Sequence, residues 1–324
     1  MSRRLGIVMD AIDSIKPWKD SSFAMLLEAR RRGWDIHYMV LDDLYMEDGI
    51  SLARTRDLQV TDRREDFYQL GAFETIPLGE LDLILMRKDP PFDLEYIYAT
   101  YFLEQAEEQG ALVVNRPQSL RDCNEKLFTR EFPQCCAPFR VARQPERLLE
   151  FLEGERDIII KPLDGMGGRS IFRLRLGDPN TNAIIEAVTD HGQKQAMVQR
   201  FIPEIREGDK RILLIDGEPI PWALARIPAE GENRGNIAAG ASTRGQPLSD
   251  RDRWICEQIA PRLREKGLLF VGIDVIGDYL TEINVTSPTG IRELDAQFDL
   301  NIAGELFDAV ERRLRSPSLT PAKH

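Results

Sequence analysis

The chain has 324 residues, of which 42% are hydrophobic and 30% are charged, and its net charge is −11 at pH 7. This length exceeds that of a usual single hydrophobic core, so we expect a globular protein of two or three domains. The negative charge argues against nucleic acid or an anionic membrane as a partner. No stretch is long enough to span a bilayer, and Asp10 ends the N-terminal apolar run too early for a secretion signal.

The cysteines contain no C-x-x-C pair and stand at Cys123, Cys135, Cys136 and Cys256. This usage fits reduced thiols in a cytoplasmic protein better than a disulfide framework or a zinc site. The chain has only three histidines. Histidine-based catalysis or metal binding is therefore not expected.

The first third of the chain alternates predicted strands with predicted helices. The strands are expected at 5–9, 35–41, 81–86 and 112–115, and the helices at about 22–33 and 94–109. Such alternation predicts a parallel sheet, whose ligands gather at the carboxyl ends of the strands. Asp10, Arg87 and Asn115 occupy such ends. Each could contact a ligand or serve only as a turn residue.

A second unit begins at Asn124, which is the expected cap of a helix that starts with Glu125. Lys126, on this helix, is either a phosphate contact or a solvated charge. Further along, the strand predicted at 196–201 leads into a connector, where exposed backbone groups could read the edge of an adenine.

The stretch 157–174 predicts two strands joined by a glycine-rich loop. Its three glycines, Gly165, Gly167 and Gly168, let backbone N–H groups approach a ligand closely, and Lys161 adds a charge at the base of the loop. The spacing does not match the Walker pattern or the dinucleotide-binding pattern. We therefore expect a flap over phosphates, although an ordinary mobile hairpin has the same composition.

The third unit opens with two strands at 211–215 and 218–226, which flank the hairpin signal Asp216-Gly217. This register pairs Ile215 with Glu218 and places Arg211 and Arg226 on one face of the sheet. Two guanidinium groups on one face suit phosphate or carboxylate ligands. Two arginines on a solvated face are the alternative.

Residues 228–247 are rich in glycine and small polar residues and contain no aromatic residue. A loop of this length inside a compact domain is usually a functional lid or a disordered segment. After it, Ser249 is expected to cap a helix that reaches about Lys266 and bends at Pro261.

The segment 270–288 contains the expected metal site. Glu282 and Asn284 lie two apart on a predicted strand, so their side chains share a face, and oxygen ligands of this kind suit Mg²⁺. Asp274 joins them only if the connection between the strands has an odd length, such as Gly277 to Tyr279. A two-residue turn would send Asp274 to the opposite face.

Several of these motifs together resemble one known family. They are L-M-R-K-D-P-P-F-D at 85–93, K-P-L-D-G-M-G-G at 161–168 and T-E-I-N-V-T-S-P at 281–288. With the glycine-rich lid, they resemble prokaryotic glutathione synthetase, a member of the ATP-grasp superfamily. The resemblance implies an α/β chain (α+β overall) with an N-terminal Rossmann-like domain at 1–123, a central lid domain at 124–200 and a catalytic domain at 201–315. The tail 316–324 is expected to be disordered, and the protein to be a cytoplasmic homotetramer.

The resemblance also implies residue roles. ATP is expected to contact Lys126, Lys161, Gly165, Met166, Gly167, Gly168, Gln199, Arg200, Phe201, Ile202 and Asp209. Mg²⁺ or Mn²⁺ would be held by Asp274, Glu282 and Asn284. The catalytic set is Arg211, Lys161, Arg226 and Arg234, and the other substrates would meet Asp10, Arg87, Arg211 and Arg226.

The implied reaction joins γ-glutamylcysteine to glycine through an acyl phosphate while ATP is cleaved to ADP and phosphate. Another ATP-grasp ligase with a different acceptor, or a non-catalytic ATP-binding module, are the alternatives. The lid segment 240–243 lacks the double glycine common in this family, which affects the expectation for its mobility but not for the chemistry.

Overall fold

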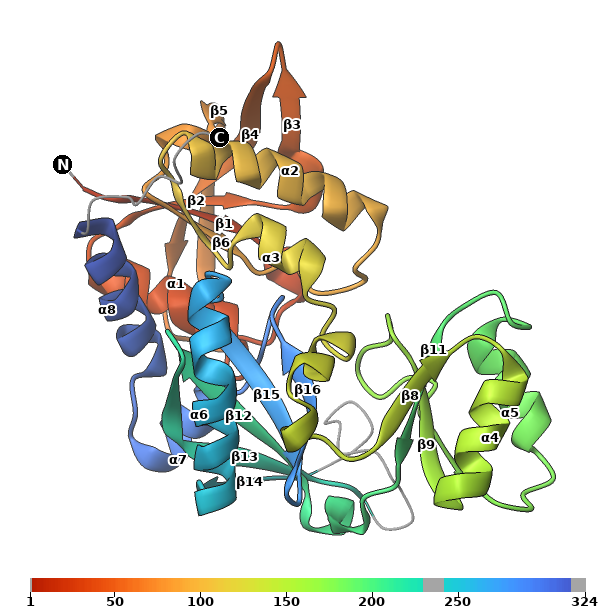
Figure 1. Cartoon of the computed structure of the whole chain (residues 1–324). Coiled ribbons are helices and arrows are strands. Elements are labelled where there is room, and N and C mark those ends of the chain that lie inside the picture. Colours follow the sequence, from red (N-terminus) through yellow and green to blue (C-terminus); the bar gives the residue numbers. More distant parts are fainter. Residues whose placement is uncertain (1, 230–241, 316–324) are drawn as a thin grey trace.

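The computed structural model describes residues 2–229 and 242–315. These residues form three sheets, and the glycine-rich hairpin lies in the middle one (Figure 1). The residues 230–241 of the expected lid, including Arg234, and the expected tail 316–324 lie outside the described residues. No helix in the described part is both long and apolar enough to cross a membrane.

The first sheet confirms the predicted parallel arrangement. Its parallel strands pair in the order β2-β1-β6-β7 and are β1 (Arg4–Val8), β2 (Asp35–Met39), β6 (Leu83–Met86) and β7 (Leu112–Val114). The helices of this region are α1 (Ser21–Arg31), α2 (Leu94–Glu108) and α3 (Pro117–Asp122). Asp20 and Asp93 begin the first two helices by accepting hydrogen bonds from backbone N–H groups at 2.7 and 3.0 Å.

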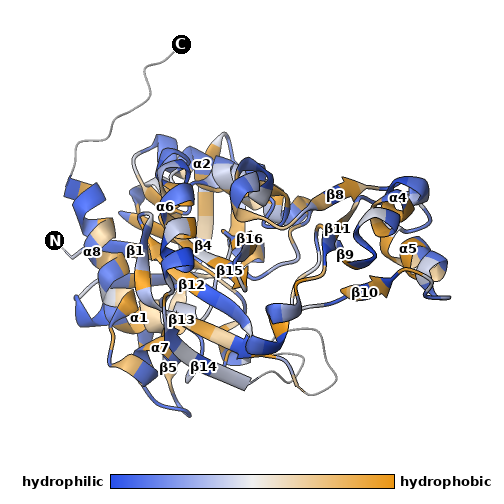
Figure 2. Cartoon of the chain, turned by 60° about the horizontal axis from the view of Figure 1, so that its bottom comes forward, coloured by the Kyte–Doolittle hydropathy of each residue, from blue (hydrophilic) through white to orange (hydrophobic). Residues whose placement is uncertain are grey.

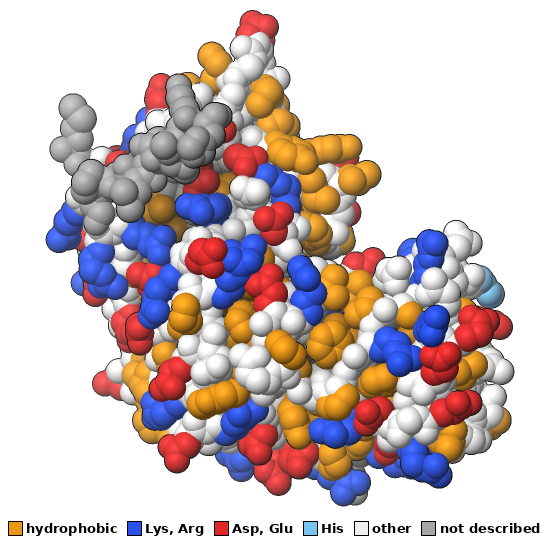
Figure 3. All heavy atoms as spheres, in the orientation of Figure 1, with side chains coloured by type: hydrophobic (Ala, Val, Ile, Leu, Met, Phe, Trp, Pro, Cys, Tyr) orange, Lys and Arg blue, Asp and Glu red, His pale blue; other side chains and the backbone are white. Residues whose placement is uncertain are grey.

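Three further strands extend this sheet and were not predicted. They are β3 (Leu44–Glu47), β4 (Ile50–Val60) and β5 (Tyr68–Pro77), and they pair in antiparallel fashion. Large hydrophobic side chains are exposed on them and on α2, namely Tyr45, Met46, Ile50, Phe73, Leu94, Tyr98 and Tyr101. Hydrophobic side chains line this edge of the molecule in Figure 3.

The middle sheet is antiparallel, in the order β10-β9-β11-β8. Its strands are β8 (Phe139–Ala142), β9 (Asp157–Pro162), β10 (Phe172–Arg175) and β11 (Ala196–Arg200), and its helices are α4 (Pro145–Glu155) and α5 (Thr181–Thr189). Strands β9 and β10 are the two strands predicted around the glycine-rich loop. The helix expected at Glu125 is a short 3₁₀ helix, Leu127–Glu131, and its N-cap position is Lys126 instead of the expected Asn124. Asn124 Oδ1 still accepts from the N–H groups of Lys126 and Leu127, just before this helix.

The third sheet has the order β14-β13-β12-β15-β16. Its strands are β12 (Asp209–Ile215), β13 (Glu218–Ile227), β14 (Ser242–Pro247), β15 (Phe270–Ile276) and β16 (Tyr279–Asn284). The helix α6 (Asp250–Glu265) lies between β14 and β15, and α7 (Ile291–Phe298) and α8 (Ile302–Arg315) follow β16. Ile215 pairs with Glu218 and Ser249 caps α6, as predicted. The predicted end of the loop at residue 247 is wrong, because residues 242–247 form a strand that pairs with β13.

The hydrophobic cores join the first and third sheets and leave the middle one separate. Two core clusters combine residues of the first sheet with residues of the third, whereas the third cluster contains only residues 142–198. Figure 2 shows the β8–β11 unit with α4 and α5 standing apart from the rest. Asn115 links the two larger parts, because its side chain donates to Phe270 O and Val285 O, each at 2.7 Å. The expected domain boundaries near 123 and 200 stay a prediction.

Candidate active site

Two adjoining cavities lie between the glycine-rich loop and the third sheet. The larger, of about 220 Å³, is called here the acceptor cavity, and the smaller, of about 100 Å³, the nucleotide cavity. The residues that line both of them are Gly165, Met166, Gly167, Asp274 and Glu282. A group bound in one cavity can therefore reach a group bound in the other.

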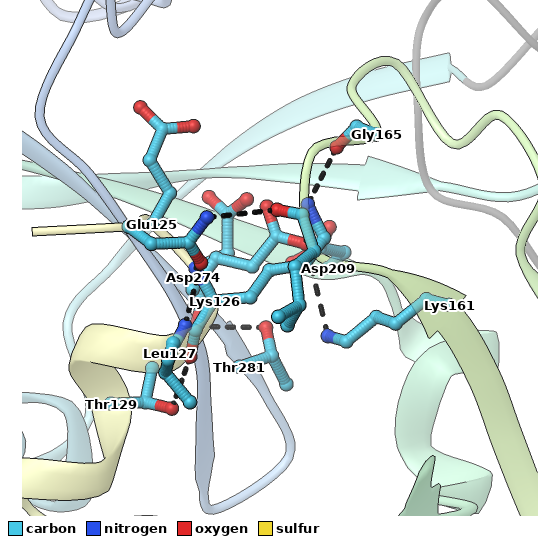
Figure 4. A network of polar contacts seen from close by, with 12 residues as sticks. Glu125, Lys126, Leu127, Thr129, Lys161, Gly165, Asp209, Asp274 and Thr281 are labelled. Carbon is cyan, nitrogen blue, oxygen red and sulfur yellow. Dashed lines mark hydrogen bonds and ion pairs between the residues drawn. The ribbon is translucent and has the colours of Figure 1, made fainter. Parts of the chain in front are cut away.

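Two lysines reach the wall of the nucleotide cavity from different elements. Lys126 Nζ lies 3.5 Å and Lys161 Nζ 3.8 Å from Glu282 Oε1, and both lysines are buried. Figure 4 shows the two ammonium groups converging on the carboxylate cluster, while Glu125 points away from it. Burial lowers the pKa of Lys161. An anionic ligand such as a polyphosphate would offset the repulsion between these two positive charges.

The loop between β9 and β10 has the backbone that its glycines predict. Gly167 and Gly168 have φ angles of 64° and 76°, which favour glycine. Gly165 is constrained by packing instead, because a Cβ atom there would lie 2.7 Å from Pro162 Cγ. The carbonyl of Gly165 accepts a hydrogen bond from Lys126 Nζ at 2.6 Å. The loop is thus tied to the lysine that precedes the middle sheet.

The other end of the nucleotide cavity is apolar. Its hydrophobic lining consists of Ile159, Ile171, Phe201, Ile202, Ile205 and Ile276. Gln199 and Arg200 also line it, and Arg200 donates to the hydroxyl of Tyr279 at 3.0 Å. The predicted segment 199–202 is therefore brought together with both lysines and with Asp209.

The two cavities meet at a buried cluster of charges. Arg211 binds Asp274 through two hydrogen bonds, with Nε–Oδ1 at 2.6 Å and Nη2–Oδ2 at 3.2 Å. Arg226 Nη2 lies 2.9 Å from the same carboxylate and 2.5 Å from Asp209 Oδ2. The two arginines hold the pKa of Asp274 far below its usual range, whereas burial raises the pKa of Asp209 to about 6. The predicted shared face of Arg211 and Arg226 is confirmed.

Asp274 faces Glu282, but not for the predicted reason. Ile276 pairs with Tyr279 across a two-residue turn, so the expected odd connection from Gly277 to Tyr279 is wrong. The register changes one step further along, where Val275 pairs with Leu280 and Asp274 with Glu282. Thr281 is the extra residue in β16, and a bulge of this kind changes which side chains share a face. The expected pairing is therefore confirmed through a bulge instead of a longer turn.

The segment 285–290, which follows β16, forms one wall of the acceptor cavity and is tied down on several sides. Glu125 Oε1 accepts from the N–H groups of Val285 and Thr286 at 3.0 and 3.2 Å. Ser287 Oγ donates to Asp89 Oδ1 at 2.6 Å. These bonds come from the first part of the chain, so the acceptor cavity depends on both ends of the sequence.

Arg87 and Asp10 act behind this wall. Arg87 is buried and donates to Pro288 O at 2.9 Å and to Ser22 Oγ at 3.0 Å. Asp10 pairs with Lys88 at 2.8 Å and accepts from the N–H group of Asp89 at 3.0 Å. Neither residue lines the two cavities. In this structure, Arg87 and Asp10 position the cavity wall. Their direct contact with substrate stays a prediction.

The four cysteines are free, so the expected absence of disulfides among them is confirmed. Burial raises the pKa of each thiol, to about 11 for Cys123 and to about 12 for Cys136 and Cys256. These thiols stay protonated near neutral pH and are poor nucleophiles.

Comparison with known families decides the classification. Residues 4–121 match the N-terminal domain of prokaryotic glutathione synthetase, and residues 125–299 match the ATP-grasp domain of the same family. The chain belongs to the prokaryotic glutathione synthetase family. It is an ATP-dependent ligase, and the fold and function expected from the sequence are confirmed.

Individual relatives agree with this family over the whole chain. A glutathione synthetase from Pseudomonas aeruginosa is 61% identical over 314 residues, 97% of this chain and 99% of that protein. One from Vibrio vulnificus is 60% identical over 313 residues, with the same coverage. Among solved structures, D-cycloserine synthetase DcsG superposes with a TM-score of 0.66 at 15% identity, covering 96% of this chain and 100% of that one. D-alanyl-alanine synthetase A from Vibrio cholerae superposes with a TM-score of 0.57 at 12% identity, covering 97% and 99%. These two structures support the fold alone.

Several cavity residues of this glutathione synthetase family member were not anticipated. They are Asp89, Glu125, Thr286, Ser287, Gly290 and Glu293. Three of them, Asp89, Thr286 and Ser287, belong to the motifs that carried the resemblance, and this was the only available signal. Glu293 gave none, because a glutamate in a helical first turn is usually explained by the helix dipole.

Proposed function

We propose that the glutathione synthetase reaction of this chain, the joining of γ-glutamylcysteine to glycine with cleavage of ATP, takes place where the two cavities meet. The observation that carries this proposal is that both cavities are lined by Asp274 and Glu282. One cavity has buried lysines and an apolar end, which suit a nucleotide. The other has arginines and carboxylates, which suit a zwitterionic substrate.

The chemistry requires activation of a carboxylate. An amine does not displace an oxygen of a free carboxylate at a useful rate, because that oxygen is a poor leaving group. Transfer of the γ-phosphoryl group of ATP to the cysteinyl carboxylate gives an acyl phosphate. The glycine amino group then attacks the acyl carbon and phosphate leaves. No covalent enzyme intermediate is needed, so the protein acts by positioning and by neutralising charge.

In the nucleotide cavity, Lys126 and Lys161 would bind the phosphates, and the loop 165–168 would cover them. The apolar end would hold the adenine ring, with the strand end at Gln199 to Ile202 reading its edge. Asp209 also lines this cavity, which supports the expected contact with the nucleotide sugar.

Arg211 would stabilise charge on the transferring phosphoryl group and on the tetrahedral intermediate. Its guanidinium is fixed in direction by Asp274, and Arg226 is fixed by Asp209 and Asp274. Fixed donors lose little free energy to reorganisation during the reaction. Arg234, the other expected catalytic arginine, stays a sequence-based proposal.

The residues expected to hold Mg²⁺ or Mn²⁺ fit such an ion unequally. Glu282 lines both cavities and contacts the lysines only at 3.5 and 3.8 Å, and Asn284, whose amide oxygen would be the ligand atom, lines the acceptor cavity. Asp274 is engaged by two arginines. Across 2–229 and 242–315, no three His, Cys, Asp or Glu side chains are arranged to hold a metal. We propose Glu282 and Asn284 as the main protein ligands, with Asp274 joining when its arginines turn to phosphate. The ion would neutralise the β- and γ-phosphates.

We also retain the expected homotetramer and cytoplasmic location as proposals. The exposed hydrophobic side chains on β3, β4, β5 and α2 support self-association, because contiguous apolar surface often marks an interface. Light scattering of the purified protein would measure the mass directly.

The function is tested by following ADP and glutathione together. With γ-glutamylcysteine, glycine and ATP, we expect one ADP for each glutathione, and without glycine only slow ADP release. ADP release that glycine does not stimulate, or that another amine stimulates far more, would favour a ligase with a different acceptor. No ADP release under any condition would favour a non-catalytic ATP-binding module.

A further inference from the structure

Glu293 is a carboxylate in the acceptor cavity whose charge is incompletely satisfied. It lies in the first turn of α7 and lines the cavity. Its Oε2 atom is buried and finds no hydrogen-bond partner among residues 2–229 and 242–315. A buried carboxylate oxygen without a donor is costly, so such an atom in a cavity indicates a missing ligand.

The ordinary structural use of a glutamate at this position is already filled by another residue. Glu293 is the third residue of α7, where a glutamate commonly accepts from the N–H group of the residue that caps the helix. That residue is Gly290, and its N–H group donates instead to Ser21 Oγ at 3.1 Å. The N–H group of Ile291 donates to the same oxygen at 3.2 Å. Glu293 is therefore not needed to begin the helix.

The neighbouring cations do not supply a hydrogen bond to Glu293 Oε2 either. Arg292, next to it in the chain, pairs with Asp62 at 2.8 Å. Burial raises the pKa of Glu293, and Lys19, whose side chain is exposed, offsets this effect only in part. Asp20 is also close enough to act on Glu293, and it adds negative charge. A cationic group entering the cavity would find an unpaired carboxylate oxygen there.

Glu293 lines the acceptor cavity alone. Asp274, which binds Arg211, lines both cavities and so marks their junction. Arg211 Nη1 contacts Thr289 O at 3.4 Å, and Glu293 follows four residues later, one helical turn into α7. The carboxylate to be phosphorylated must lie near Arg211 and the junction with the nucleotide cavity, so a cation at Glu293 belongs to another part of the same substrate.

We infer that Glu293 binds the α-ammonium group of the γ-glutamyl part of the substrate and thereby selects substrates that carry this group. This inference rests on the proposed function. In γ-glutamylcysteine, seven bonds separate the α-amino nitrogen from the cysteinyl carboxyl carbon, a span of roughly 8 Å when extended, from ordinary bond lengths. The substrate therefore has a cation and a reacting carboxylate at its two ends, as the cavity has an anion and a cation.

The test compares γ-glutamylcysteine with N-glutarylcysteine, which lacks only the α-amino group. The wild type should prefer γ-glutamylcysteine by at least 10-fold in kcat/KM. Glu293→Gln should raise the KM for γ-glutamylcysteine at least 10-fold and reduce this preference to less than about 3-fold, while the KM values for ATP and glycine stay within 2-fold. Glu305→Gln, which removes an exposed charge from the first turn of α8, should behave like the wild type.

A preference that survives in Glu293→Gln would overturn the inference, and so would a rise confined to the KM for glycine. If that variant does not fold, Glu293→Asp carries the test, because it keeps the charge but shortens the side chain. It should keep most of the preference with a moderately raised KM, and an unchanged KM would contradict the inference. A wild type that forms no glutathione would instead count against the proposed function itself.

Discussion

Arg211 and Asp274 form a buried two-point ion pair across neighbouring strands, with hydrogen bonds of 2.6 and 3.2 Å. The pair fixes the guanidinium plane of Arg211, which lines the acceptor cavity, beside Asp274, which lines both cavities. Removing one donor aimed at developing charge typically costs about 10²–10³ in kcat. Arg211→Ala should therefore lower kcat at least about 10²-fold while ATP binding survives.

Steady-state kinetics and a nucleotide titration check this prediction together. Arg264→Ala is the matched control, because Arg264 is exposed and pairs with Glu218 outside both cavities. Loss of ATP affinity with a normal kcat at saturation would assign Arg211 to ground-state binding instead.

Glu282 is expected to control the metal requirement. Glu282→Gln keeps the shape of the side chain but removes the negative charge that faces Asp274 on the neighbouring strand. The Mg²⁺ concentration for half-maximal activity should rise at least about 10-fold, because oxygen ligands for Mg²⁺ depend on carboxylate charge. Glu218→Gln, at the exposed turn of the β12–β13 hairpin, is the control. An unchanged Mg²⁺ dependence would remove Glu282 from the site.

The glycine-rich loop gives a prediction about ATP. In Gly165→Ala, the new methyl group would lie 2.7 Å from Pro162 Cγ, so the loop must shift at the residue whose carbonyl accepts from Lys126. The KM for ATP should rise several-fold. Gly154→Ala, in α4 with open space around it, should leave KM unchanged and raise the free energy of unfolding by up to about 1 kcal/mol. Equal KM values for ATP in both variants would contradict the proposed contact between loop and phosphates.

Asp209 should make stability depend on pH. Its pKa is raised by burial to about 6, against about 3.9 in an unfolded chain. The folded state holds this proton where the unfolded state has lost it, so the stabilisation is complete below about pH 4 and is lost as the pH rises through 6. Between pH 5 and 7, the free energy of unfolding of the wild type should fall by about 1 kcal/mol relative to Asp209→Asn. Urea unfolding of both proteins measures this, and a constant or rising difference would contradict the assignment.

The sequence predicted those parts of the site that depend on local periodicity. Arg211 pairs with Leu224 across the hairpin, and Arg226 lies two residues further along the same strand, so the two arginines share a face. The residues 165–168 form a loop because their glycines break two strands. The bulge at Thr281 was not predictable, because threonine is an ordinary strand residue. The opposition of Asp274 and Glu282 was therefore reached through a wrong connection.

Long-range packing was equally out of reach. Nothing near Arg87 indicates that its guanidinium supports Pro288, 201 residues away, and nothing near Gly290 indicates that Ser21 caps α7. The shared cores of the first and third sheets arise from such contacts. The strands at 44–77 were missed because hydrophobicity does not follow burial there. In β4, for example, Ser51 and Thr55 are buried whereas Ile50 is exposed.

The central claim is that the chain activates the cysteinyl carboxylate as an acyl phosphate before glycine attacks. It is tested most directly with γ-glutamylcysteine labelled with ¹⁸O in both oxygens of the cysteinyl carboxylate. Mass spectrometry of the products should find one ¹⁸O atom in each phosphate released and one in the new peptide carbonyl. Phosphate without the label, alongside normal formation of glutathione, would contradict the account.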